Sequence, residues 1–179
     1  NSIYHKFLWP DNVYIFKNGI QKVSYKEADI YGFGQTQPFV YDRLLADFKV
    51  EDEDRINIMA LHAMLVSENA KSEYLPISKS EIEKTGLDYL ALGHIHKYSE
   101  IQYANKTAYA YSGCIEGRGF DELMERGMIL ADINKEKSEF EFAATNQRRY
   151  LIEDVDVSDC VNMFDIINKV ENSLSKYSN

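Results

Sequence analysis

The stretch Asp88-Tyr-Leu-Ala-Leu-Gly-His-Ile-His96 decides the fold. Its first five residues form a short, largely apolar run between two glycines, which predicts a buried strand that ends at Gly93. His94 and His96 follow that end directly. Because positions i and i+2 of an extended segment share a face, both imidazoles are expected to reach one metal site.

A third histidine has the same setting. The run Ile56-Asn-Ile-Met-Ala-Leu61 predicts a second buried strand, and His62 stands at its carboxyl end. In open α/β sheets, ligands gather outside the carboxyl ends of the strands, so the three histidines are expected at one edge. With 9 Gly and 4 His in 179 residues, a chance Gly-His-x-His is expected roughly 0.005 times per chain. The alternative, histidines that only make hydrogen bonds in a loop, stays open.

The order of these motifs resembles the C-terminal half of a calcineurin-like metallophosphoesterase. The motifs are the strand ending at His62, then Gly93-His94-Ile95-His96, Tyr111-Ser112-Gly113 and Gly117-Arg118-Gly119-Phe120-Asp121-Glu122. Within that superfamily the chain is most similar to the SbcD-type DNA repair exonucleases, a branch that residues 9–16 and 30–34 also resemble. The fold implied is α/β (α+β): a strand-rich half of a four-layer α/β/β/α sandwich.

Three earlier metal motifs of that family are missing here. They are an Asp-x-His, a Gly-Asp and a Gly-Asn-His-Asp, and the chain opens at Asn1 instead of a methionine. We therefore expect a piece of a longer protein, cut by design or by proteolysis. Residues 1–153 would form the C-terminal half of the catalytic domain. Residues 154–179 would be a linker and a helix that either opens a cap domain or packs back on the sheet.

The resemblance also implies a metal site. His62 and His94 would ligate one divalent ion and His96 a second, with carboxylates from the missing motifs completing both shells. Mixed nitrogen and oxygen ligands suit manganese, iron or zinc, and the family favours manganese. Gly113 and Arg118 are expected beside the site. Arg118 could contact a phosphate or pair with an acidic neighbour, Asp121 or Glu122.

No catalytic residue is assigned from the sequence. Phosphodiester hydrolysis by two divalent ions uses an activated bridging water and charge neutralisation on the phosphoryl oxygens. With three imidazoles and no partner carboxylates, this chain is expected to hold metal weakly, or at one site only, and to lack appreciable nuclease activity alone.

Three functions remain open for the whole protein. The first is a manganese-dependent DNA repair exonuclease that works beside an SbcC-like ATPase, and the second is a phosphoesterase of nucleotides or small phosphodiesters. The third is a degenerate scaffold that binds a partner. A half-domain would also expose a sheet face and a strand edge, which favours dimerisation or aggregation.

Composition limits these choices. A formal charge of −9 argues against this chain alone gripping a phosphate backbone, although Gln147-Arg148-Arg149 is a small basic patch or a solvated strand. Two cysteines without metal spacing favour a reduced, cytoplasmic location. No apolar run is long enough to span a membrane.

The remaining pattern predicts the other elements. In the first half we expect strands at 13–16, 20–25 and 28–32, with an Asn18-Gly19 turn between the first two. A helix is expected at 42–48, a solvated acidic loop at 51–54, and mostly loop from 64 to 74. A capped helix is expected to begin at Ser78 and to stop at Gly86. In the second half we expect hairpins of 100–103 with 107–111 and of 128–133 with 139–143. They would be followed by a strand at 149–155 and a helix at 162–174 capped by Ser158-Asp159.

Overall fold

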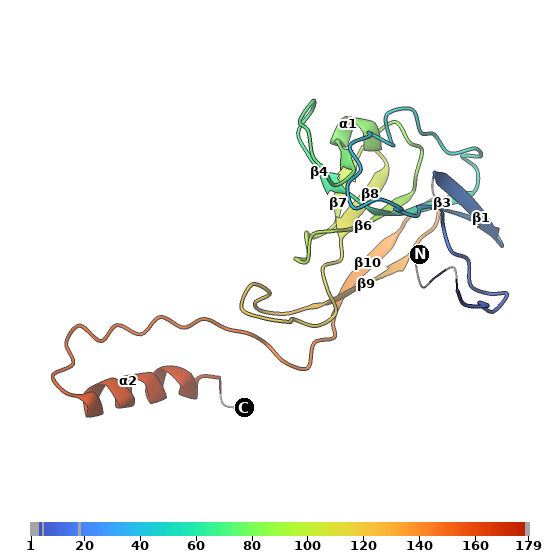
Figure 1. The fold of residues 1–179 in the computed structure, drawn as a ribbon. Helices are drawn as coiled ribbons and strands as arrows, with labels where there is room; N and C mark the ends of the chain where they lie inside the picture. The colour runs from blue at the N-terminus through green and yellow to red at the C-terminus, as the bar shows by residue number, and fades with distance from the viewer. Residues whose placement is uncertain (1–3, 5, 18, 178–179) are drawn as a thin grey trace.

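The computed structural model describes residues 4, 6–17 and 19–177, and one six-stranded sheet organises it (Figure 1). In spatial order its strands are β1 (Ile20–Tyr25), β2 (Ala28–Phe33), β3 (Ile56–His62), β6 (Tyr89–Gly93), β8 (Thr107–Tyr111) and β7 (Gln102–Ala104). Two further pairs are β4 (Met64–Leu65) with β5 (Pro76–Ile77), and β9 (Gly127–Asp132) with β10 (Glu139–Ala144). The helices are α1 (Lys79–Ile82) and α2 (Met163–Ser175). The expected strand-rich α/β class is confirmed.

The centre of the sheet is parallel. Strands β2, β3, β6 and β8 run in the same direction, while β1 and β7 pair antiparallel at the two edges. The chain passes from β3 through α1 to β6, which is the crossover expected between parallel neighbours. The carboxyl ends of the four parallel strands therefore share one edge.

One face of the sheet carries the core. Alternate residues of neighbouring strands point to the same side, and on this side they are almost fully buried. The buried set includes Tyr31, Met59, Leu61, Leu90, Leu92, Tyr109 and Tyr111. Leu45, Ile77 and Ile82 join the same core from loops and from α1, so the helix side of the sheet is closed.

Helix α1 begins where the sequence predicts. The carboxylate of Glu81 accepts a hydrogen bond of 2.7 Å from the Ser78 amide, which satisfies a free donor at the helix start. Arg43 donates to both oxygens of Glu81 at 2.8 Å, so the loop before β3 is tied to this helix. Gly86 then takes a φ of +77°, a conformation that ends the segment before β6.

Three predicted elements are wrong. Residues 13–16 form no strand: the chain does not fold back on the outer edge of β1, and the Lys17 carbonyl instead accepts from the Gly34 amide, just beyond the end of β2. Residues 149–155 also lack a ladder partner, and the Tyr150 carbonyl accepts from Met124 instead. Residues 42–48 form successive turns instead of a helix, with bonds from Ala46 to Arg43 and from Phe48 to Leu45. The predicted Asn18-Gly19 turn lies partly outside the described residues.

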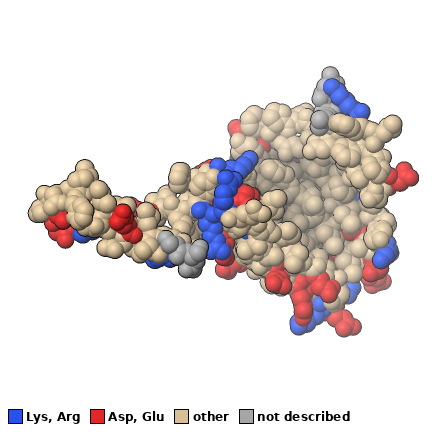
Figure 2. Space-filling model, turned by 90° about the horizontal axis from the view of Figure 1, so that it is seen from below, with Lys and Arg blue, Asp and Glu red and all other residues tan. Residues whose placement is uncertain are grey.

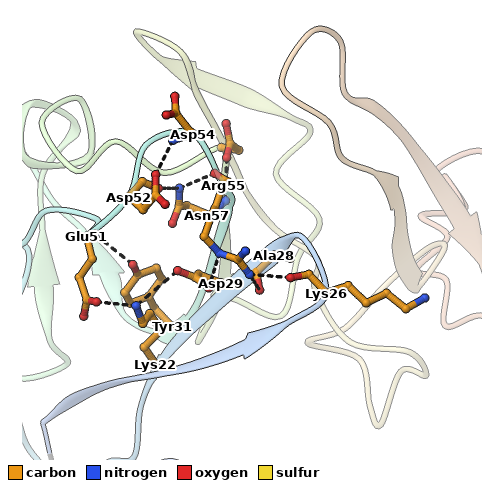
Figure 3. Close-up of polar contacts among 11 residues, drawn as sticks. Lys22, Lys26, Ala28, Asp29, Tyr31, Glu51, Asp52, Asp54, Arg55 and Asn57 are labelled. Carbon is orange, nitrogen blue, oxygen red and sulfur yellow. Dashed lines mark hydrogen bonds and ion pairs between the residues drawn. The ribbon is translucent and has the colours of Figure 1, made fainter.

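A polar cluster ties together the amino ends of the parallel strands (Figure 3). Asp29 is 1% exposed and binds the Arg55 guanidinium at 2.9 Å, with Lys22 3.4 Å away on its other side. Asn57 is fully buried beside it and donates to the carbonyls of Asp52 and Arg55. This network lies at the strand ends opposite to the histidines and fixes the register of β2 and β3.

The other face of the sheet is more open. The register places four small residues, Gly32, Ala60, Ala91 and Ala110, in one row across it. Phe140 of β10 packs on Tyr89 at one side of this face, with ring centroids 5.1 Å apart. Seen from below, the molecule is hollowed here and the hollow shows mainly uncharged side chains, while Lys and Arg gather where the C-terminal segment leaves the body (Figure 2).

Helix α2 stands at the end of an extended segment, away from the sheet (Figure 1). Asn162 caps it, since its side chain accepts from the Asp165 amide at 3.0 Å. The Ser158-Asp159 cap expected from the sequence is therefore wrong by one turn. No residue of the helix is buried, and its apolar residues, such as Met163 and Phe164, face solvent. Among the described residues, no helix is long and apolar enough to cross a membrane.

Candidate metal centre

His62 and His94 meet at the carboxyl edge of the sheet. His62 is the last residue of β3 and its backbone pairs with Gly93, so the residue that follows β6 comes to lie beside it. The Nδ1 atom of His94 is 3.2 Å from the Nε2 atom of His62, and the two rings are nearly perpendicular. The structure thus brings together two of the three histidines that the sequence predicts at this edge.

The backbone of His94 is strained to make this contact. Its φ is +103°, a region that residues with a side chain rarely adopt, and such conformations cost on the order of 1–3 kcal/mol. Gly93 lets the strand pass close to the partner ring, because an added Cβ there would be 3.3 Å from the His62 Nδ1 atom. The backbone therefore turns the His94 ring toward His62 and out of the extended path.

The environment of His94 favours the neutral form of its imidazole. Burial lowers the pKa of its imidazole, and positive charge on His62 or His96 would lower it further. A neutral imidazole has a free lone pair, and this is the form that binds a divalent metal.

The ring of His96 makes its contacts with Glu122 and Arg118. Its Nδ1 atom lies 2.6 Å from the Oε1 atom of Glu122, a side chain that is 5% exposed. The φ of +103° at His94 interrupts the extended path from which a shared face of His94 and His96 was expected, although His96 remains close enough for its charge to act on His94. The carboxylate instead occupies one ring nitrogen of His96 and leaves Nε2 as the atom that could bind a metal.

Glu122 is held as an anion. The Arg118 backbone amide donates to its Oε2 atom at 2.8 Å, and this bond, followed by those from His96 and the Arg118 side chain, lowers its pKa to about 2. Arg118 therefore pairs with Glu122 and not with Asp121. Its guanidinium is 74% exposed and lies 3.4 Å from His96 Nδ1, next to the expected site.

Two more residues hold the loop of His96. Gly113 has a φ of +79°, and an added Cβ would be 3.1 Å from the His96 carbonyl and 3.0 Å from the Tyr98 amide. Arg126 is 7% exposed and donates a hydrogen bond to the same carbonyl. Gly113 therefore lies against the backbone of the loop that carries His96.

The donors fit a divalent ion in part. Two nitrogens that both bind one ion at about 2.0–2.1 Å, with tetrahedral or octahedral angles, stand roughly 2.8–3.4 Å apart. The 3.2 Å between His62 and His94 falls in that range, and it also fits a hydrogen bond between the rings. In the described part of the chain, no three His, Cys, Asp or Glu side chains come together as a metal cluster. These imidazoles thus fit as a partial ligand set.

Sequence reasoning missed the contacts that orient the histidines. Glu122 was considered only as a partner for Arg118, and Arg126 and Tyr74 were not considered. The ring of Tyr74 packs on His94 with centroids 4.8 Å apart. One signal was available for Glu122: an acidic residue in the loop after β8 lies at the same carboxyl edge as the histidines.

Comparison with known proteins bears on this site. No family model matches the chain. It is 29% identical over 174 residues to an uncharacterized metallophosphoesterase, YhaO, of Bacillus subtilis (strain 168). The match covers 94% of this chain and 42% of the relative, so the chain spans about two fifths of that protein's length. This similarity to a metallophosphoesterase supports the calcineurin-like resemblance that the histidine motif indicated.

Proposed function

We propose that this chain supplies the imidazole part of a two-metal centre in a phosphoesterase, and that the whole protein is a manganese-dependent DNA repair exonuclease. The observation that carries the proposal is the contact of His62 with His94 at the ends of adjacent parallel strands. Similarity to a metallophosphoesterase supports the reaction class. The DNA substrate rests on the SbcD-like character of residues 9–16 and 30–34.

The chemistry divides between metal and protein. Bound divalent ions would supply an activated water and neutralise charge on the phosphoryl oxygens. His62 and His94 would present neutral nitrogens, which leave more positive charge on the centre than carboxylates do, so the centre attracts a phosphate. Glu122 would hold the ring of His96, and the exposed guanidinium of Arg118 would contact a phosphoryl oxygen.

The charge of the chain favours a second candidate. With a formal charge of −9, the surface repels a long polyanion more than it repels a small one. Nucleotides or small phosphodiesters are therefore the alternative substrates. A comparison of hydrolysis rates on single-stranded DNA and on a nucleotide diester by the full-length protein would separate the two candidates.

The proposal also covers the C-terminal residues 154–179 and the surfaces that would meet partners. Residues 154–179 would open a second domain, which the solvent-facing apolar side chains of α2 support. An SbcC-like ATPase is the proposed partner of the whole protein. The hollowed face of the sheet in Figure 2 is where a second copy, or another part of the protein, would pack.

The test is a calorimetric titration of this chain with Mn²⁺, together with hydrolysis of bis-p-nitrophenyl phosphate. We expect weak binding at one site, lost in a His62→Ala, His94→Ala double variant, and no appreciable turnover. Asp121→Asn, which changes an exposed acid beside Glu122, is the control and should bind as the unchanged chain does. Absence of Mn²⁺ binding would reject the metal centre, and rapid turnover would reject the partial ligand set.

A further inference from the structure

A row of three partly exposed aromatic rings leads away from the histidines. Tyr74 packs on His94, Phe39 lies 6.0 Å from Tyr74, and Tyr41 lies 6.5 Å from Phe39, all measured between ring centroids. Their exposed fractions are 42% for Tyr74, 42% for Phe39 and 63% for Tyr41. We call these three residues the aromatic row.

The backbone builds this row. The Val40 amide donates to the Glu73 carbonyl at 2.8 Å, and the Leu75 amide donates to the Val40 carbonyl at 2.7 Å. These bonds hold residues 39–41 beside residues 73–75. Leu75 is 1% exposed and takes a φ of +49°, which is a strained conformation for a bulky residue. Leu75, which is buried and strained, thus fixes the segment that carries Tyr74.

A cation stands next to the row. Tyr41 lies in the walls of two open clefts, one of which also contains Phe39 and the other Lys71. Arg43 in the second cleft is bound by Glu81. Lys71 is exposed, and in the described part of the chain it forms no ion pair. The cleft therefore offers one ammonium group to an anion beside the ring of Tyr41.

We propose that the aromatic row and Lys71 form a binding path for single-stranded nucleic acid, in which bases stack on Phe39 and Tyr41 and a backbone phosphate meets Lys71. Every base has a π-face, so aromatic platforms accept any sequence. The path ends at His94, where the proposed function places the scissile phosphate, and the inference rests on that function. Binding by the path itself needs no metal.

The experiment is fluorescence anisotropy with the chain at about 0.15 M salt, which screens the repulsion between the probe and the chain's formal charge of −9, and in the presence of EDTA, so that no hydrolysis occurs. The probes are a labelled oligothymidylate and an abasic oligomer of the same length. We expect the oligothymidylate to bind more tightly than the abasic oligomer by about 5-fold to 150-fold for each base that stacks. A Phe39→Ala, Tyr41→Ala double variant should lose this preference while it binds the abasic oligomer unchanged.

Two variants make the result specific. Tyr25→Ala removes a ring that is also 63% exposed but lies at the end of β1, away from the row, and it should keep the preference. Lys71→Gln should weaken binding of both probes and reduce the salt slope by about 0.7, which corresponds to one phosphate contact on a single strand. Tyr74 is left unchanged because its ring packs on His94.

Three results would overturn the path: equal affinity for the two probes, binding of neither, or a double variant that behaves as Tyr25→Ala does. The Mn²⁺ titration described above reports on the metal centre alone. A chain that binds Mn²⁺ but shows no base preference rejects the path and keeps the centre. The reverse pattern keeps the path and rejects the centre.

Discussion

Glu122 lies 2.6 Å from the Nδ1 atom of His96 and accepts a second hydrogen bond from the Arg118 amide. A carboxylate in this position fixes both the tautomer and the orientation of a histidine ring. His96 thus enters the candidate site with Nε2 free, which is the nitrogen available to a metal.

The first prediction is that, in the full-length protein, Glu122→Gln weakens Mn²⁺ binding at the site that includes His96 by about 10-fold to 100-fold. Titration calorimetry measures the affinity, and ¹⁵N-resolved NMR of the imidazole should show a mixture of tautomers where the unchanged chain shows one. Asp121→Asn is the matched control. An unchanged tautomer in Glu122→Gln would show that the carboxylate does not orient the ring.

The second prediction concerns Gly113. Gly113→Ala should lower the free energy of unfolding by more than Gly19→Ala does, although both glycines have a φ near +80°. An alanine in that conformation costs on the order of 1–3 kcal/mol at either position. The two positions differ in their surroundings. A Cβ added at Gly113 would lie 3.0–3.3 Å from backbone atoms, whereas a Cβ added at Gly19 would have nothing within 4 Å. Urea unfolding of both variants measures the difference in the free energy of unfolding. Equal losses would mean that the His96 loop shifts to accommodate the methyl group at no cost.

The sequence predicts the part of the candidate site that depends on local pattern, which is the approach of His62 to His94. His62 and His94 follow apolar runs of strand length, and the carboxyl edge of parallel strands brings such positions together. The contact of His96 with Glu122 was not predictable in this way, because 26 residues separate them and the β8 loop decides where they meet. The positive φ of His94 was also hidden, since Gly93 and not His94 carries the usual signal for an unusual conformation.

The fold shows the same division between local pattern and tertiary context. Leu44, Leu45 and Phe48 have helical spacing and do face the core, yet they lie in turns. Seven residues are too few for a helix to be stable without tertiary support, and here Arg43 is bound to Glu81 instead. Apolar spacing thus predicted burial correctly and the element wrongly.

The third prediction concerns acid stability. Burial alone would raise the pKa of Asp29, but hydrogen bonds from Ser24 and Arg55 and the charges of Arg55 and Lys22 hold it below its ordinary value of 3.8. A carboxyl with a lowered pKa in the folded state contributes stability above its unfolded pKa. That contribution is lost as the pH falls below about 4 and through the folded pKa.

Asp29→Asn should therefore be less stable at neutral pH and should lose less stability between pH 5 and strongly acidic solution, roughly pH 2. Urea unfolding at a series of pH values measures this difference. Asp47→Asn, at an exposed position, should follow the unchanged chain. A variant at Asp29 with an unaltered acid profile would assign the acid response to other carboxyl groups.

The last prediction separates the two interpretations of α2. Ile167 and Leu174 are 46% and 50% exposed, and the helix has no buried residue. Ala favours helix, so an Ile167→Ala, Leu174→Ala variant keeps α2 and tests only its packing. If α2 stands away from the sheet, the free energy of unfolding of the body should change by no more than about 0.5 kcal/mol.

Leu45→Ala, in the buried core, should cost about 2–5 kcal/mol and calibrates the urea measurement. A loss in the α2 variant comparable to that of Leu45→Ala would show that the helix packs on the sheet, and would remove the support that its exposed face gives to a second domain.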